Sequence, residues 1–188
     1  MAYKMIVLDL DGTLTNNKKE ITPRTYEALM EAQKKGIVVV LASGRPTYGI
    51  MPLAKQLKLA EYGGYILAYN GGKIMDCKSG DTVFNQELCP DLVPMLYDEA
   101  MKAGVQILTY QGDGIAATKA DDEYVEHEAF INKMPVVEYS DFKNQVEYPI
   151  NKCLIVGDPE PLHKLELKLA AEMEGKISVY RSAPFFLE

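Results

Sequence analysis

Two aspartates, Asp9 and Asp11, followed by Gly12 and Thr13, are the residues of this sequence best suited to chemistry. They end the apolar segment Lys4–Leu10, which is predicted to be a buried strand because it is short and rich in branched side chains. Side chains two apart on a strand share a side, so the two carboxylates can converge. Close carboxylates repel unless a cation joins them. Mg²⁺, which accepts one or two carboxylates together with a substrate phosphate, is the natural partner.

The two residues after the acidic pair fit a loop that approaches a phosphate. Gly12 lets the backbone turn sharply, and the Thr13 hydroxyl can donate a hydrogen bond that holds the loop. The alternative is a solvated pair of carboxylates at a strand end, with no chemical role.

A second candidate loop follows the apolar segment 37–41, which is also predicted to be a buried strand. Ser43, Gly44, Arg45 and Pro46 come next, ahead of a predicted helix over 47–57. A hydroxyl between a strand end and a helix N-terminus is a good cradle for phosphate. Two alternatives stay open, namely that Ser43 is a plain helix N-cap and that Arg45 is a surface cation.

A third loop begins at Asn70, after a predicted strand over 65–69. The Asn70-Gly71 pair favours a tight turn by itself, so a structural role is the alternative to a role near the substrate.

The segment Asp9–Thr13 resembles the first motif of the haloacid dehalogenase (HAD) superfamily, Asp-x-Asp-Gly-Thr at the end of the first strand. The resemblance implies that Asp9 is the nucleophile and Asp11 the general acid and base. It also implies that Mg²⁺ is held by the Asp9 side chain and the Asp11 backbone carbonyl, with Gly12 and Thr13 near the phosphate. Leu10 separates the chain from the P-type ATPases, which carry Lys after the nucleophile.

The second loop is similar to that of the Cof-type branch of this superfamily. The resemblance implies that Ser43 binds the transferring phosphoryl group and that Gly44 lies beside it. It implies that Arg45 holds the substrate or supports a cap domain, and that Asn70 lies near the substrate entrance.

The order of the predicted elements gives the fold class. Strand, helix, strand, helix and strand over the first 69 residues predict an α/β, Rossmann-like parallel sheet. An antiparallel α+β pattern follows: a hairpin at 73–84, a helix at 90–103, a hairpin at 105–118, a helix at 121–132, strands at 136–137 and 151–156, a helix at 159–174, and strands at 177–180 and 184–187. The resemblance implies that residues 1–82 are the N-terminal part of a HAD core with the catalytic loop, and residues 83–188 resemble an inserted C2-type α+β cap.

Composition limits the partners and the compartment. The chain has 27 acidic and 20 basic side chains and a net charge of −7, opposite to the excess typical of nucleic-acid binders, so an anionic substrate needs a local cation. No apolar run is long enough to cross a membrane, and three scattered cysteines suggest reduced thiols in a cytoplasm. We expect a small phosphorylated metabolite as partner, no nucleic acid or membrane, and a monomer or weak homodimer.

The function expected from these features is Mg²⁺-dependent hydrolysis of small phosphate monoesters, with sugar phosphates as the class that the resemblance implies, through an aspartyl-phosphate. Two alternatives stay open. One is a sugar phosphomutase of the same superfamily, and the other is a non-catalytic, phospho-accepting or Mg²⁺-sensing module.

The family's phosphate-binding Lys and last metal-binding Asp follow the cap, so we expect them to lie beyond Glu188, with the last part of the core sheet missing. Asp158 does not replace this Asp, because it precedes a predicted helix inside the cap pattern. We therefore predict that the 188-residue chain turns over an aryl phosphate more slowly than a chain extended past Glu188. Equal Mg²⁺-dependent turnover numbers for the two chains would contradict this expectation.

Overall fold

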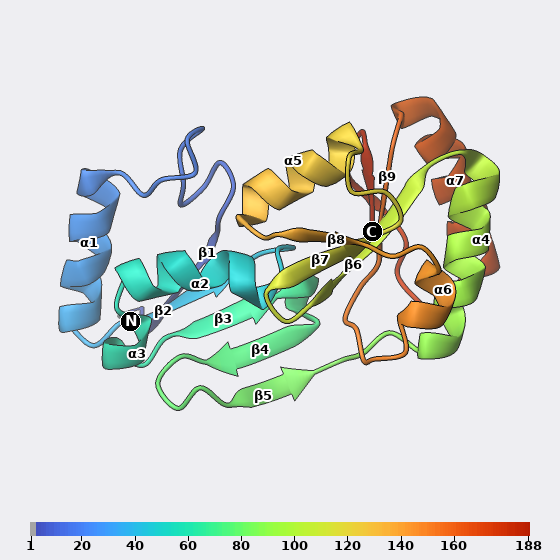
Figure 1. The fold of residues 1–188 in the computed structure, drawn as a ribbon. Coiled ribbons are helices and arrows are strands. Elements are labelled where there is room, and N and C mark those ends of the chain that lie inside the picture. Colours follow the sequence, from blue (N-terminus) through green and yellow to red (C-terminus); the bar gives the residue numbers. More distant parts are fainter. Residues whose placement is uncertain (1–2) are drawn as a thin grey trace. The chain divides into compact units, whose positions relative to one another are not determined.

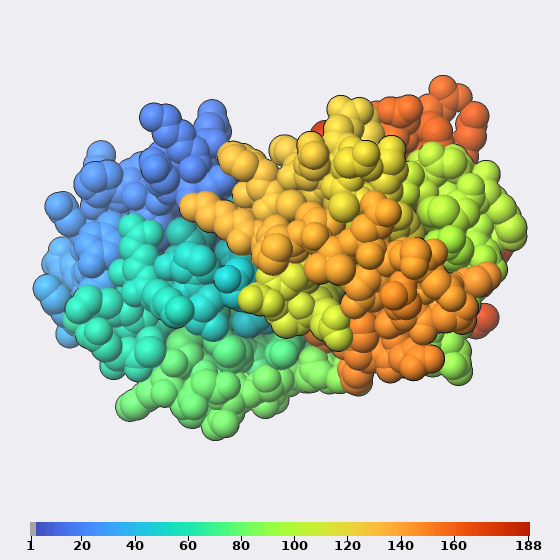
Figure 2. Space-filling model, in the orientation of Figure 1, coloured from blue at the N-terminus to red at the C-terminus, as the bar shows by residue number. Residues whose placement is uncertain are grey.

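The structure, a computed structural model, describes residues 3–188 and forms two compact units, residues 1–86 and 87–188. Figures 1 and 2 show the first unit in blue to green and the second in yellow-green to red. The units divide after Gln86 rather than after residue 82, because strand β5 (Thr82–Asn85) pairs with strand β4 (Lys73–Asp76). The assignment of the two parts as core and cap stays a prediction.

The first unit is a five-stranded sheet in the order β1-β2-β3-β4-β5, in which β1, β2 and β3 are parallel and the β4–β5 hairpin is antiparallel (Figure 1). The α/β fold class is therefore confirmed. The remaining elements of this unit are β1 (Met5–Asp9), β2 (Val38–Ala42), β3 (Tyr65–Ala68), α1 (Pro23–Lys34), α2 (Thr47–Gln56), α3 (Leu59–Tyr62) and the 3₁₀ turn η1 (Tyr69–Gly71).

Apolar side chains from the strands and helices of this unit form one core. Helix α1 begins at an N-cap, Thr22, whose hydroxyl accepts from the Thr25 backbone N–H at 3.3 Å, and Pro23 occupies its first turn. The core includes residues from the first loop as well as from the elements: Leu10, Leu14, Ile21, Leu29, Val39, Leu41, Ile50, Leu53, Ala54, Leu57, Leu59, Ile66 and Ala68.

Strand β1 is correctly predicted, but its predicted burial is wrong. Met5 is 51% and Val7 is 56% exposed. In the described part of the chain β1 pairs with β2 alone, so it is an edge strand of the sheet. A run of branched apolar residues indicates a strand but does not reveal how many neighbours cover it.

The second unit has a six-stranded sheet in the order β10-β11-β9-β6-β7-β8. Its elements are η2 (Pro90–Leu92), α4 (Val93–Ala103), β6 (Gln106–Gln111), β7 (Gly114–Ala117), α5 (Glu123–Asn132), β8 (Val136–Glu138), α6 (Phe142–Gln145), β9 (Leu154–Val156), α7 (Pro159–Glu172), β10 (Arg181–Ala183) and β11 (Phe186–Leu187). The β7–β8 pair is parallel, whereas the rest of the sheet is antiparallel as predicted.

The strand predicted at 177–180 is wrong. The strand of this region is β10, and the alternation of Ile177 and Val179 reflects side chains packed against the core of the second unit. Asp158 does precede helix α7, but its side chain makes no capping hydrogen bond and instead accepts from the Tyr124 hydroxyl at 3.0 Å.

A buried polar group in the second unit is satisfied by its neighbours. Glu128, 6% exposed, accepts from the Tyr110 hydroxyl and from the Asn132 amide, each at 2.6 Å. Burial raises the pKa of Glu128, against the opposing effect of these hydrogen bonds and of Lys152. Among the described residues, no helix is long and apolar enough to cross a membrane.

Candidate functional site

The carboxyl ends of β1, β2 and β3 bring the three predicted loops to one edge of the first unit's sheet. In the parallel register Asp9 is the partner of Ala42, and Ala42 is the partner of Leu67. The segments that follow these positions hold the acidic pair, Ser43 and Asn70. Ligand sites of open parallel sheets lie at this edge, so the topology agrees with the site predicted from sequence.

The first loop is fixed by burial and by a hydroxyl that the sequence did not single out. Leu10 is fully buried, and its carbonyl accepts from the Thr15 hydroxyl at 2.9 Å and from the Thr15 N–H, also at 2.9 Å. Thr13 was expected to hold the loop, but its side chain is exposed and hydrogen-bonds to no residue between 3 and 188. Gly12 has φ of +81°, a conformation that favours glycine, so the expected sharp turn is present.

Arg45 from the second loop binds Asp11 from the first. Its Nε donates to Oδ2 at 2.9 Å and its Nη2 to Oδ1 at 2.6 Å, a two-point contact between guanidinium and carboxylate. Arg45 is only 8% exposed, so the alternative that it is a surface cation is wrong. The sequence around Arg45 did not predict that its partner would be Asp11.

A second cation, Lys19, reaches the same carboxylate. Its Nζ lies 2.7 Å from Asp11 Oδ1. Burial raises the pKa of Asp11, but the hydrogen bonds and charges of Arg45 and Lys19 outweigh that effect, and the pKa lies below the usual 3.8. The structure therefore favours ionised Asp11, and it adds Lys19 to the residues around the acidic pair.

The second and third loops are bound to each other through their backbones. The Asn70 N–H donates to the Ser43 carbonyl at 3.1 Å, and the Tyr69 N–H donates to the Arg45 carbonyl at 3.0 Å. The Ser43 hydroxyl accepts from the Arg45 N–H at 3.2 Å, whereas helix α2 has Pro46 as its N-cap. Ser43 is therefore not the N-cap of this helix, so the alternative that it is a plain N-cap is wrong.

The third loop is strained where it meets the second. Tyr69, Asn70 and Gly71 have φ of 52°, 56° and 91°, so three successive residues occupy the left-handed region. Gly71 adopts this conformation readily, but Tyr69 and Asn70 cost on the order of 1–3 kcal/mol each and persist there because the surroundings fix them. The Asn70 amide lies so close to Gly44 that a Cβ there would sit 2.7 Å from its Oδ1. Asn70 is thus more than an isolated tight turn, because it determines which residue fits at Gly44.

Asp9 differs from Asp11 in having no partner. Its side chain is exposed, and no residue between 3 and 188 donates a hydrogen bond to it or forms an ion pair with it. Its carboxylate and the backbone carbonyl of Asp11 are hard oxygen donors of the kind that Mg²⁺ takes. Within residues 3–188 no group of three or more His, Cys, Asp or Glu side chains could hold a metal. The donor set therefore fits an ion that completes its shell with water and substrate oxygens, as Mg²⁺ does.

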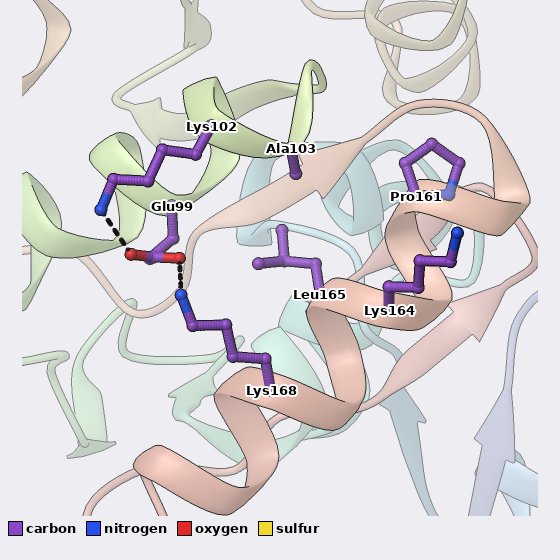
Figure 3. Close-up of a pocket in the computed structure, with 7 residues that line it drawn as sticks. All are labelled: Glu99, Lys102, Ala103, Pro161, Lys164, Leu165 and Lys168. Carbon is purple, nitrogen blue, oxygen red and sulfur yellow. Dashed lines mark hydrogen bonds and ion pairs between the residues drawn. The ribbon is translucent and has the colours of Figure 1, made fainter.

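A pocket of about 420 Å³ lies elsewhere, between helices α4 and α7 of the second unit (Figure 3). Its polar side chains are already paired: Glu99 binds Lys102 at 2.8 Å and also Lys168, and Lys164 binds Glu160 at 2.9 Å. None of the predicted site residues lines it. We assign it no part in the chemistry.

Comparison with known proteins decides the family. A model of the haloacid dehalogenase-like hydrolases matches residues 6–188. The chain belongs to this family. The family predicted from Asp9–Thr13 is therefore confirmed.

Solved structures and curated relatives agree with this hydrolase assignment. A haloacid dehalogenase-like hydrolase from Bacteroides thetaiotaomicron is 50% identical, with a TM-score of 0.94 over 99% of this chain and 70% of that one. A Bacillus subtilis protein named "Putative phosphatase YxeH" is 29% identical over 99% of this chain and 69% of its own length. The Bacillus subtilis 5-amino-6-(5-phospho-D-ribitylamino)uracil phosphatase YcsE is 28% identical, over 84% of the present chain and 62% of the length of YcsE.

The contact between Gly44 and Asn70 gives a prediction about stability. Gly44→Ala should lower the free energy of unfolding by about 1–3 kcal/mol, because the new Cβ displaces the Asn70 amide from a strained turn. Asn70→Gly, which tolerates the left-handed conformation and removes the amide, should recover most of that loss in the double variant. Denaturant unfolding of the four chains measures the coupling, and additive effects would contradict the contact.

The Asp11–Arg45 pair gives a prediction about pH. Asp11→Asn should lower the unfolding free energy by about 1–2 kcal/mol near neutral pH in metal-free buffer, because it removes the negative charge that two N–H groups of the buried Arg45 guanidinium contact. Since the folded pKa lies below the usual 3.8, the stabilisation is complete above that value and is lost as pH falls through the folded pKa.

The difference between the two chains should therefore shrink below about pH 4. Denaturant unfolding at a series of pH values checks this, with Asp91→Asn, an exposed aspartate of the second unit, as the matched control. A difference that stays constant down to the lowest pH at which the chain is folded would contradict the assigned role of the ion pair.

Proposed function

We propose that this hydrolase is a Mg²⁺-dependent phosphatase that hydrolyses small phosphate monoesters, with sugar phosphates as the substrate class, through an aspartyl-phosphate on Asp9. The observation that carries the proposal is the contrast between the two aspartates. Asp9 has an exposed carboxylate at the strand end with no side-chain partner in residues 3–188, whereas the Asp11 carboxylate is bound by Arg45 and Lys19. One carboxylate is accessible for attack and the other is oriented.

The reaction runs in two displacements at phosphorus. An Asp9 carboxylate oxygen attacks in line, and the bond from phosphorus to the ester oxygen breaks. Asp11, which takes up a proton from solvent when the phosphate dianion enters, gives that proton to the departing alcohol. Water then attacks the aspartyl-phosphate and gives its proton to Asp11. The bond from phosphorus to the Asp9 oxygen breaks, which releases inorganic phosphate and restores the carboxylate.

The metal and phosphate contacts follow from the same geometry. The Asp9 carboxylate and the Asp11 backbone carbonyl would hold Mg²⁺, which supplies positive charge that stabilises the phosphoryl oxygens and shields Asp9. The Asp11 carboxylate already binds two cations, Arg45 and Lys19. This supports the proposal that Asp11 would bind Mg²⁺ through its backbone carbonyl rather than through its carboxylate. Around the phosphoryl group we place Gly12, Thr13, Ser43 and Gly44, with Asn70 positioning the second loop.

The relatives support the class of reaction. YxeH and YcsE carry phosphatase names, and the sugar phosphatase BT4131 of HAD subclass IIB shares the fold, with a TM-score of 0.75 at 19% identity. We extend these observations to propose that residues 87–188 form the cap that selects the leaving group, and that the enzyme acts on cytoplasmic metabolites.

The nucleophile assignment predicts the result of one substitution. Asp9→Asn should abolish release of inorganic phosphate from an aryl phosphate, because the amide cannot form the acyl phosphate. The matched control Asp91→Asn should keep the activity of the unsubstituted chain. Removing divalent cations with a chelator should also stop turnover, and added Mg²⁺ should restore it.

Phosphate release by Asp9→Asn at the rate of the unsubstituted chain would refute the nucleophile, and chelator-resistant turnover would refute the metal. Product analysis with a hexose phosphate tests the reaction class. Phosphate that returns to a second position of the sugar, with no inorganic phosphate formed, would show a phosphomutase instead.

A further inference from the structure

Lys19 contacts the acidic pair although nothing in its local sequence marks it as a functional residue. Its Nζ lies 2.7 Å from Asp11 Oδ1, across eight positions of the chain. Among the described residues, Asp11 is its only side-chain partner. The neighbouring Lys18 is exposed and its side chain has no hydrogen bond or ion pair with any residue between 3 and 188.

Hydrogen bonds in the loop around Lys19 fix the backbone from which this side chain extends. Asn16 Oδ1 accepts from the N–H groups of Lys18 and Glu20 at 2.8 and 3.1 Å, and the Asn16 carbonyl accepts from the Lys19 N–H at 2.8 Å. These bonds close a tight turn in which Lys19 has φ of 61°. A left-handed lysine is unfavourable by itself, and such outliers gather where a side chain must be delivered to a particular place.

The two cations on Asp11 are held to different degrees. Arg45 contacts both carboxylate oxygens and its side chain is 8% exposed. Lys19 makes one contact, to an oxygen that Arg45 already binds, and its side chain is 32% exposed. Arg45 alone therefore matches the charge of Asp11 and fixes its position. Lys19 is the surplus cation, and it is the one with solvent on one side.

We propose that Lys19 is a substrate-binding residue whose ammonium leaves Asp11 and pairs with a phosphoryl oxygen when a phosphate monoester enters the site, while Arg45 stays on Asp11. The inference rests on the proposed phosphatase function. In a chain of net charge −7, a phosphate dianion needs a cation close to its binding place, and Lys19 is a partly exposed cation already at the acidic loop. The exchange also frees one side of Asp11 for the leaving group.

Three variants test this proposal. Lys19→Asn removes the charge and keeps a residue that tolerates the left-handed conformation, and Lys19→Arg keeps the charge. Lys18→Asn is the matched control one position away. The dissociation constant of inorganic phosphate, measured by calorimetry in the presence of Mg²⁺, and the kcat and KM for an aryl phosphate are compared with those of the unsubstituted chain.

Lys19→Asn should weaken phosphate binding and raise KM by about 5- to 10-fold, the loss expected for one charge-assisted hydrogen bond, with kcat changed less than about 3-fold. Lys19→Arg and Lys18→Asn should stay within about 2-fold. Equal phosphate affinity in Lys19→Asn and Lys18→Asn would overturn the proposal. A fall in kcat with unchanged KM and phosphate affinity would also overturn it, since Lys19 would then act on Asp11 alone. Failure of the phosphatase function itself is distinguishable, because the unsubstituted chain would neither bind phosphate nor release it.

Discussion

The ion pair between Arg45 and Asp11 is the contact on which the arrangement of the site depends. A guanidinium that is 8% exposed is stable only when its charge is matched, and both oxygens of Asp11 match it. The pair joins the loop after β1 to the loop after β2. The backbone bonds from Tyr69 and Asn70 then join the second loop to the third. Removing Asp11 would therefore break a contact between charged groups at the junction of all three loops rather than at one surface position.

The third loop shows what this arrangement demands of the backbone. Three successive residues with positive φ are unfavourable, and only the last of them is a glycine. Several contacts hold the turn in place: the Tyr69 phenol, largely buried, is hydrogen-bonded to the backbone of Thr47 at the start of α2, and the Asn70 amide fills the space over Gly44. These contacts offset the backbone strain of the third loop, and they also fix the position of the second loop, which carries Ser43. A site that must place several donors within hydrogen-bonding distance of one phosphate benefits from such rigidity.

Sequence reasoning predicted which loops meet at one edge of the sheet better than it predicted the contacts between them. Apolar runs ending in Asp9, Ser43 and Asn70 sufficed to predict the three strands and the edge where they meet, because parallel strands align their carboxyl ends. The partner of Arg45, the loop hydroxyl of Thr15 and the reach of Lys19 depend on side-chain directions that no spacing rule contains. The exposure of β1 was missed for a related reason, since an apolar strand looks the same in sequence at the edge of a sheet and inside it. In the second unit, Ile177 and Val179 alternate as a strand would, yet packing rather than pairing explains them.

Asp9 and Asp11 have the same side chain, and only their surroundings distinguish the roles that we propose for them. Asp9 ends a strand with an exposed carboxylate that has no partner in residues 3–188, so it keeps its electron pairs available to an electrophile. Asp11 lies where Gly12 turns the chain, and two cations hold its carboxylate and favour its ionised form. An ionised Asp11 can accept the proton of an attacking water, but it can protonate a leaving group only after some of that positive charge moves away. The less tightly held cation, Lys19, is the one that can move without leaving the buried guanidinium unpaired. The asymmetry between the two cations therefore offers a physical route for the proposed mechanism, in which one carboxylate acts first as an acid and then as a base.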